Sequence, residues 1–476
     1  MIHNRQFILA KQIHSIDDTW VFVQLKNGYY INYQQNLHVE CNSDRTIAII
    51  GDAWQVDPDR ESPYIIINKW DSKTTLDAIY AEEDTWSGRY LIITEQNVLT
   101  DATGNLGCFY SQDIVSSSVA LIHKILFNVD IPMPPSIVSE KQGGAYIAGP
   151  LTMTNKIRRL LPSFILNYLN SELSYRKLLY DGIYSMDEAS AFEEFKKYFL
   201  HGIESMLDYY QGYDIWLPIS GGRDSRICLA AFEKLSVNYN IYVFQNENVH
   251  VAGCYEDLGV SRLLSKKIRK HLFVFKKDKK LYDSYRAKEF EQHTAGMATM
   301  SCKWQYTHHT LKYLENNNSK VVQIRNNVWE LVCNYYTAFN TPEKVINYWR
   351  DKGENNFSSI QEWVKLVKND KINEYIDFGD RAYWDLRCGC WLSDGLQGFD
   401  IFDNIETVNV FNCRRYISIL MGLDSELRRS RAFEEKLANQ WFPLFSTVPY
   451  TENYIDVKII SQEIFSKIKR KLKKFI

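Results

Sequence analysis

The fold is decided by one stretch of the chain, Leu217-Pro218-Ile219-Ser220-Gly221-Gly222-Arg223-Asp224-Ser225-Arg226. The apolar run at 213–217 leads into it and predicts a buried parallel strand. The run at 227–234 follows and predicts a helix. A tight glycine turn between a strand and a helix directs several backbone N–H groups, and the positive end of the helix dipole, at one place. The stretch therefore predicts an anion site.

The side chains of this loop suit a phosphate chain accompanied by magnesium. Ser220 and Ser225 supply hydroxyl groups beside the N–H groups of Gly221 and Gly222, and the Asp224 carboxylate can hold Mg²⁺. The alternative is an ordinary strand–turn–helix connection, because Gly-Gly and Asp-Ser are frequent in turns. The whole word Ser-Gly-Gly-x-Asp-Ser is more specific than that. It differs from the Gly-x-x-x-x-Gly-Lys-Ser/Thr loop of NTPases that transfer the γ-phosphate.

The word resembles the pyrophosphate loop of enzymes that split ATP between the α- and β-phosphates, such as the asparagine synthetase family. A stretch from Gly88-Arg89-Tyr90 through Asp101-Ala102-Thr103-Gly104 to Tyr110 predicts a hairpin and resembles the glutaminase half of that family. A third stretch resembles the family's linker, with Ser163 in place of a glycine: Gly149-Pro150-Leu151-Thr152, then Ile157-Arg158-Arg159-Leu160-Leu161-Pro162.

The resemblance implies two domains of an α/β protein. Residues 1–180 would form a degenerate αββα domain like that of the N-terminal nucleophile (Ntn) hydrolases. Residues 181–476 would form a synthetase domain of the adenine-nucleotide α-hydrolase type, with a parallel sheet and helical extensions. A working glutaminase of this class needs a cysteine after the initiator methionine, with its own α-amino group as base. Ile2 stands there, so we expect the N-terminal domain to be inactive.

The order of predicted elements agrees with this division. Strand-like runs at 19–23, 46–52 and 89–93 predict a β-rich first part. From about residue 186 the pattern becomes helical, and strands at 241–244 and 271–275 are separated by a helix near 257–268. Alternating strands and helices indicate a parallel sheet with its ligand at the carboxyl ends of the strands.

A second stretch with chemical interest lies at 321–336, where a strand leads into a polar turn and a helix. The asparagine synthetase family has Ser-Gly-x-Gly-x-Asp-Glu at the matching position, and its Asp binds magnesium. This chain keeps the glutamate as Glu330. It has Trp329 in place of the Asp, and Arg325 and Asn327 in place of the glycines.

Glu330 has two interpretations. It supplies the second magnesium carboxylate beside Asp224, or the base for the incoming amine; otherwise it is a first-turn glutamate that favours a helix N-terminus. Its place after a strand of the same sheet favours function. Arg325 could clamp a phosphate or carboxylate with its planar fork, or be an exposed strand-end arginine. Related synthetases place a lysine late in the chain to stabilise charge, and the resemblance implies Lys436 for that role.

The composition limits which kinds of partner and which compartment we expect for the protein. The 476 residues carry a net charge of −2, with 45% hydrophobic and 24% charged residues, which is typical of a globular protein without a field for nucleic acid. No apolar run approaches ~20 residues, so we expect no membrane insertion. Nine scattered cysteines argue for a reducing compartment, and we expect a cytoplasmic protein. A homodimer is compatible with the sequence. The basic tail at 466–476 is either a solvated helix end or a surface for an anionic partner.

These features predict an ATP-dependent ligase that forms a C–N bond. It would use ATP and Mg²⁺ to adenylate a carboxylate, release pyrophosphate and pass the acyl group to an amine or free ammonia, leaving AMP. The resemblance extends to β-lactam synthetases and lasso-peptide cyclases, and implies small-molecule, peptide or sugar substrates in natural-product or surface-polysaccharide modification. The alternative is a catalytically degenerate homologue that binds nucleotide as a scaffold or regulator. Sulfur transfer to a tRNA base ranks last, because neither catalytic cysteines nor a basic surface are evident.

Overall fold

The computed structural model describes residues 5–130, 147–179, 186–245, 254–276, 302–318, 320–350 and 354–454. The chain divides into two compact units: a large unit of residues 1–215 and 278–433, and a small unit of residues 216–277 and 434–476. Ile2, the predicted domain boundary near residue 180 and the basic tail at 466–476 lie outside the described residues. The predictions that rest on them stay predictions.

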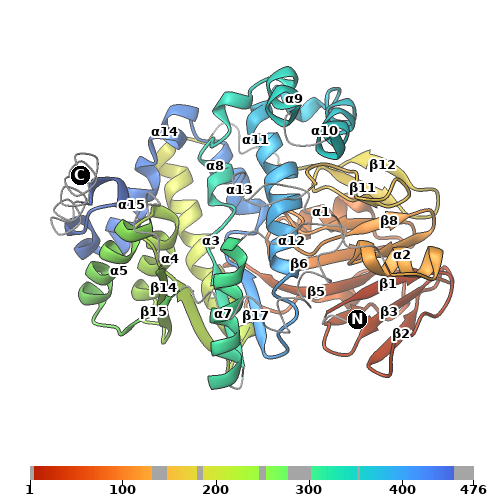
Figure 1. The fold of residues 1–476 in the computed structure, drawn as a ribbon, viewed down its shortest axis with the longest axis horizontal. Helices are drawn as coiled ribbons and strands as arrows, with labels where there is room; N and C mark the ends of the chain where they lie inside the picture. Colours follow the sequence, from red (N-terminus) through yellow and green to blue (C-terminus); the bar gives the residue numbers. More distant parts are fainter. Residues whose placement is uncertain are drawn as a thin grey trace, which may run out of the picture. The chain divides into compact units, whose positions relative to one another are not determined.

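Two antiparallel six-stranded sheets form the N-terminal part of the large unit (Figure 1). The first has the order β10-β8-β9-β1-β3-β2, made of β1 (Phe7–Ala10), β2 (Trp20–Gln24), β3 (Tyr30–Gln34), β8 (Phe109–Ser111), β9 (Ile114–Ser116) and β10 (Arg158–Arg159). The second has the order β12-β11-β7-β6-β5-β4, made of β4 (Val39–Cys41), β5 (Ala48–Gln55), β6 (Trp86–Ile93), β7 (Asn97–Thr100), β11 (Phe164–Asn167) and β12 (Glu172–Tyr175).

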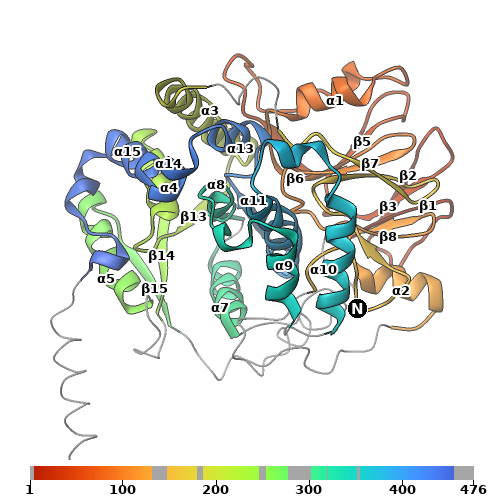
Figure 2. The ribbon, with the colours of Figure 1, turned by 90° about the horizontal axis from the view of Figure 1, so that it is seen from above.

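Alternation along the strands gives each sheet two buried faces. Leu9 of β1 and Ile50 of β5 belong to one core shared by the two sheets. Their neighbours Ile8 and Ile49 belong instead to two further cores, one with residues of α2 (Val119–Phe127) and one with residues of α1 (Leu76–Glu83). Helix, sheet, sheet and helix therefore follow one another in layers (Figure 2). This is the layering of the expected αββα domain, whereas kinship with glutaminases stays a prediction.

The stretch at 88–110 is not the single hairpin that its pattern predicts. β6 forms a hairpin with β7, but the following strand, β8, belongs to the other sheet. The turn at Asp101 carries the chain between the sheets, because its carboxylate accepts the N–H groups of Thr103 at 3.2 Å, Asn105 at 2.9 Å and Leu106 at 2.9 Å. The pattern shows the strands and the turn, but not the sheet in which each strand pairs.

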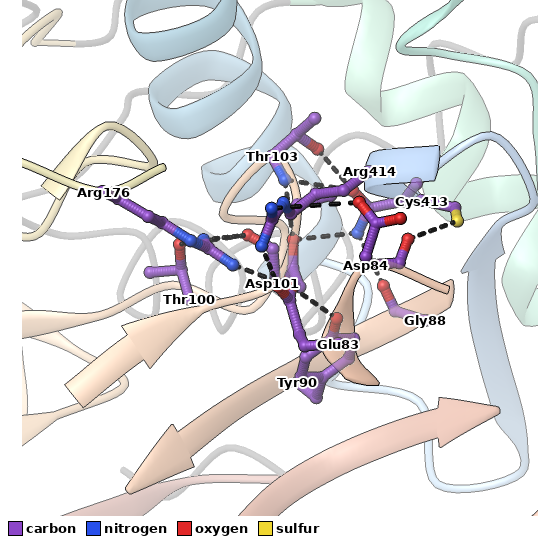
Figure 3. Close-up of polar contacts among 12 residues, drawn as sticks. Glu83, Asp84, Gly88, Tyr90, Thr100, Asp101, Thr103, Arg176, Cys413 and Arg414 are labelled. Carbon is purple, nitrogen blue, oxygen red and sulfur yellow. Dashed lines mark hydrogen bonds and ion pairs between the residues drawn. The ribbon is translucent and has the colours of Figure 1, made fainter. Parts of the chain in front are cut away.

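A buried charged network joins the second sheet to α13 (Arg414–Met421) within the large unit (Figure 3). Glu83 accepts a hydrogen bond from Arg176 at 2.7 Å on one oxygen and from Arg414 at 2.6 Å on the other. Asn412 donates to the Asp101 carboxylate at 2.8 Å. All of these side chains are buried, so the network fixes α13 against the sheet by paired charges.

The parallel strands predicted after residue 213 are confirmed. In the small unit β13 (Asp214–Pro218) pairs with β14 (Asn240–Gln245), and β14 pairs with β15 (Leu272–Lys276), all parallel. The chain enters this unit within β13. The connections contain α4 (Arg223–Lys234) and α5 (Cys254–Ile268). In the large unit β16 (Val321–Arg325) pairs in parallel with β17 (Ile405–Asn409).

The rest of the described chain is mostly helical. Its helices are α3 (Glu188–Tyr209), α7 (Cys302–Asn317), α8 (Trp329–Val332), α9 (Pro342–Arg350), α10 (Glu354–Val367), α11 (Phe378–Ala382), a π-helical stretch η7 (Tyr383–Leu392), α12 (Ser393–Gln397), α14 (Ser425–Ser430) and α15 (Ala432–Trp441). Short 3-10 helices are η1 (Ile67–Lys69), η5 (Thr337–Phe339), η6 (Lys371–Glu374), η8 (Pro443–Thr447) and η9 (Thr451–Asn453). Among the helices of the described ranges, none has the length and apolar character needed to cross a membrane.

Candidate phosphate-binding site

The predicted Gly-Gly loop lies in the small unit, between the end of β13 and the start of α4. The helix begins at Arg223, and its N-cap residue, Gly222, makes no side-chain hydrogen bond to the first turn. The N–H groups of a first helical turn have no partner within the helix. A glycine at the N-cap gives these donors no side-chain acceptor, and a phosphate is an acceptor well suited to a helix N-terminus.

The two loop serines hold the loop in shape. The Ser220 N–H donates to the Ser225 hydroxyl at 3.1 Å, and the Gly222 N–H donates to the Ser220 hydroxyl at 3.1 Å. The two hydroxyl oxygens lie 3.1 Å apart. Because these groups are bonded to one another, the two serines hold the loop in its shape.

Asp224 follows in the first turn of α4 and is half-buried. A carboxylate at this place puts a negative charge next to the positive end of the helix dipole, which is a favourable arrangement. An ionised carboxylate is the ligand type that Mg²⁺ prefers. The residues of the loop therefore fit a magnesium–phosphate group in kind: hydroxyls, backbone N–H groups and one carboxylate.

Asp257 is a residue of this site that the sequence analysis did not single out. It lies in the first turn of α5, and its Oδ1 accepts the N–H of Gly221 at 3.0 Å. Burial raises the pKa of this carboxyl, while hydrogen bonds from Thr451 and Gly221 oppose that shift. One signal could have found it: α5 follows β14, the parallel neighbour of β13, and the carboxyl ends of parallel neighbours share one edge.

The chain near residue 450 also reaches this loop, which no local pattern indicated. The Thr451 hydroxyl donates to Asp257 at 2.7 Å, and the Thr451 N–H donates to the Gly221 carbonyl at 3.1 Å. The ring of Tyr450 lies under two guanidinium groups, with centroid distances of 4.3 Å to Arg223 and 3.8 Å to Arg226. The loop is thus held from both sides by residues of the small unit.

The second predicted group of residues lies in the large unit. Arg325 is the last residue of β16, and its Nε donates to the Asn327 side chain at 3.3 Å. Glu330 lies in the first turn of the short helix α8. The N-cap of that helix, Val328, has φ +81°. A β-branched residue with positive φ is strained, and such strain concentrates at functional sites.

Trp329 does not take part in polar chemistry. Its ring is buried and packs edge-on against Phe411 at 4.6 Å and Phe195 at 5.5 Å between centroids. A residue in such a cluster contributes apolar burial and aromatic contacts. Trp329 is therefore part of the hydrophobic core.

The remaining predicted residues are placed as follows. Lys436 is exposed on α15, in the small unit. The pairing of Asp224 with Glu330 as magnesium ligands stays a prediction, as do the roles of Arg325 and Lys436. Within the described ranges, no three His, Cys, Asp or Glu side chains come together as a ready metal site.

A polar cavity in the large unit was not predicted. It has about 390 Å³ of empty space, including its opening to solvent, and Arg5, Asp52, Arg89 and Glu406 are among its lining residues. Arg5 forms an ion pair with Glu406. Burial raises the pKa of Glu406 to about 7, and Arg5 opposes the shift. Arg89 binds both oxygens of Asp400, at 3.0 and 2.9 Å. The arginines of this cavity are thus neutralised by the protein's own carboxylates.

Comparison with known proteins adds little. No family model matches the chain, and no curated protein matches it. Among solved structures it is similar to NMN synthetase from Francisella tularensis, with 12% identity over 56% of this chain and 98% of that one, at a TM-score of 0.23. It is also similar to the tRNA thiolase NcsA from Methanococcus maripaludis, with 12% identity over 54% and 76% of the chains, at a TM-score of 0.24. For NAD+ synthetase from Burkholderia pseudomallei the identity is 11% over 55% and 90%, and the TM-score is 0.21. At these TM-scores the superpositions establish neither family nor activity.

Proposed function

We propose that the protein is an ATP-dependent ligase that activates a carboxylate as its adenylate and transfers the acyl group to an amine or to free ammonia rather than using glutamine. One observation carries the proposal: the loop 220–225 joins a parallel strand to a helix that begins on an uncapped glycine, with two serines and Asp224 around it. Backbone donors, hydroxyls and a carboxylate at one helix N-terminus suit a pyrophosphate group with its metal.

The chemistry follows from what such a loop would hold. A substrate carboxylate oxygen attacks the α-phosphorus of ATP, the bond from that phosphorus to the bridging oxygen breaks, and pyrophosphate leaves. An amine nitrogen then attacks the acyl carbon, AMP leaves, and a base takes the proton of the amine. The loop would stabilise the charge of the departing pyrophosphate. Glu330 is proposed either as this base or as the second magnesium ligand, Arg325 as a clamp for a phosphate or carboxylate, and Lys436 as the cation that stabilises charge in the second step.

Magnesium would be held by Asp224 together with Glu330. It would neutralise the charge of the phosphate oxygens. The contribution of the loop to pyrophosphate binding would not depend on magnesium. Ser220 and Ser225 would keep the loop in its shape, and the first N–H groups of α4 would donate to the pyrophosphate. Trp329 in the aromatic core supports a site that takes its second carboxylate from Glu330 rather than from residue 329.

ATP–pyrophosphate exchange tests the proposal. We expect labelled pyrophosphate to enter ATP when the folded protein is given Mg²⁺ and a pool of carboxylic acids, and expect Asp224→Asn to abolish the exchange. Asp208→Asn, on helix α3 of the large unit, is the matched control and should keep it. Absence of exchange with every carboxylate pool, from protein shown to be folded, would refute adenylation.

A second candidate is a nucleotide-binding scaffold that does not cleave ATP. The burial of Trp329 among Phe195 and Phe411, at the position of a metal carboxylate in the asparagine synthetase family, favours it. Calorimetry with ATP and Mg²⁺ separates the two. A scaffold binds ATP in a way that Asp224→Asn weakens, and returns it intact after long incubation with every carboxylate and amine offered.

A further inference from the structure

We propose that residues 448–454, here called the strap, position the phosphate loop for its anion, so that strap seating and phosphate binding strengthen one another. The inference rests on the proposed function of the loop and adds to it the residues that hold the loop in its binding form: Thr451, Tyr450 and Asp257. All of them belong to the small unit, together with the loop.

Two glycines form the seat of the strap. A Cβ atom at Gly221 would lie 2.0 Å from the Thr451 hydroxyl, and a Cβ atom at Gly259 would lie 2.4 Å from the Tyr454 ring. Neither glycine has a positive φ, so backbone conformation does not require glycine at either place. Gly259 lies inside helix α5, where glycine costs about 1 kcal/mol relative to alanine. Close approach of the strap explains why both positions lack a side chain.

Arg226 holds the strap from the side of α4. Its guanidinium donates to the carbonyl oxygens of Val448 at 2.8 Å and Pro449 at 2.7 Å, and lies 3.8 Å from the centroid of the Tyr450 ring. The Arg223 guanidinium contacts the same ring, at 4.3 Å from its centroid. Arg223 also forms ion pairs with Glu435 and Glu452. An aromatic ring with two guanidinium groups in contact is attracted by both. The strap is therefore latched to the helix that starts at the phosphate loop.

Thr451 then connects the latch to the loop. Its hydroxyl donates to the Asp257 carboxylate, and the same carboxylate oxygen accepts the Gly221 N–H. Its N–H group donates to the Gly221 carbonyl. Thr451 thus fixes the N–H and the C=O of Gly221, which belong to the two peptide units that flank this residue: the C=O directly and the N–H through Asp257. A glycine loop is the part of the site with most conformational freedom to lose.

Positioning of this kind has a thermodynamic consequence. A loop that is already ordered loses less conformational entropy when it binds an anion, so its affinity is higher. By linkage, an anion on the loop must stabilise the seated strap to the same extent. Thr451, Tyr450 and Asp257 are positioning residues in this proposal, because they act on the ligand through the loop.

The experiment uses the full chain and inorganic pyrophosphate with Mg²⁺ as the probe, measured by calorimetry. Thr451→Val keeps the shape of the side chain and removes its hydroxyl, and we expect the affinity to fall on the order of tenfold. Tyr450→Ala removes the ring from the two guanidinium groups and should weaken binding similarly. Tyr450→Phe keeps the ring and should restore wild-type affinity.

Thr447→Val is the matched control for the threonine. Its hydroxyl donates to the Leu444 carbonyl at 2.8 Å on the exposed side of η8, so its loss should leave pyrophosphate binding unchanged. Hydrogen exchange supplies the readout that a purely structural role would not move. Because the Thr451 amide is bonded to the Gly221 carbonyl, pyrophosphate should slow its exchange in the wild type and not in Thr451→Val, where the loop is less coupled.

The outcomes separate this inference from the function on which it rests. If the wild type binds neither pyrophosphate nor ATP, the proposed function fails and the inference with it. If the wild type binds and Thr451→Val and Tyr450→Ala bind equally well, the strap has no positioning role and the ligase proposal stands. Tighter binding by these variants would also overturn the inference, because the strap would then be a cover that competes with the ligand.

Discussion

Two buried arginines of this protein, Arg414 in the large unit and Arg226 in the small one, are surrounded differently. Arg414 donates to Glu83 at 2.6 Å and lies 3.8 Å from Asp84. Arg226 has, among the described residues, no carboxylate as an ion-pair partner; carbonyl oxygens and the Tyr450 ring take that place. Burial lowers the pKa of Arg226, whereas for Arg414 the nearby Glu83 and Asp84 outweigh burial and raise the pKa.

The difference separates a buried cation with counter-ions from one that carbonyl oxygens and an aromatic ring surround. A buried cation that is paired with counter-ions is neutralised within the protein. Removing one partner leaves an uncompensated buried charge, which is strongly destabilising. Burying a cation without a counter-ion costs stability. The Arg226 guanidinium is satisfied by carbonyl oxygens and a ring of the strap instead. The contrast predicts that substitutions lower the free energy of unfolding to different extents. The loss should be largest for a carboxylate bonded to two arginines, smaller for a carboxylate bonded to one arginine, and smallest for an arginine without a carboxylate partner.

The largest effect is expected at the carboxylate with two partners. Glu83→Gln keeps the shape of the side chain and removes the charge between Arg176 and Arg414, and we expect a loss of about 3–5 kcal/mol in the free energy of unfolding. Urea denaturation measures it. Glu82→Gln is the neighbouring control: this side chain is partly exposed, with surface pairs to Lys69 and Arg60, and should cost about 0–1 kcal/mol. Equal losses in both variants would contradict the distinction.

The next effect concerns Asp380, whose ion pair within the described ranges is with Arg428 at 3.0 Å. Burial raises the pKa of Asp380 to about 6, and Arg428 only partly opposes the shift. Because the folded state then binds the proton more tightly than the unfolded state, stability should fall as pH rises from about 4 to about 6. The expected loss is about 3 kcal/mol.

Asp380→Asn has no proton to lose and should not show that component of the pH dependence. Urea denaturation of both proteins at several pH values gives the difference between the two curves. A difference that stays constant between pH 4 and pH 6 would show that one arginine suffices to keep this carboxylate ionised.

The smallest effect on stability is expected for Arg226→Met. No carboxylate loses a partner, the apolar stem still packs, and the desolvation of a charge is relieved; the change should stay below about 2 kcal/mol. Affinity for pyrophosphate should nevertheless fall, because the strap loses its latch. Arg226→Lys retains the charge but not the planar fork for two carbonyls, and should be intermediate in affinity. A stability loss as large as that of Glu83→Gln would mean that Arg226 is a structural residue after all.

Part of the site could be predicted because it is local. The strand before Ser220, the glycine turn and the helix after it are successive in the chain, and each shows in hydrophobic period and turn chemistry. The parallel strands β14 and β15 were predictable for the same reason. Trp329 shows the limit of that approach: a tryptophan beside a glutamate at a strand end looked like an altered metal site, and only packing against Phe411 identifies it as core.

What the sequence by itself determined is thus the succession of strand, loop and helix around 220–225, and the alternation that makes the strands of that region parallel. Only the tertiary structure decided that Asp257 and Thr451, 194 residues apart along the chain, meet at Gly221. It also decided that the turn at Asp101 passes the chain from one sheet to the other. The physical reason is that local patterns express the preferences of neighbouring residues, whereas contacts between distant segments form only when the burial of the whole fold offsets the entropy of bringing them together.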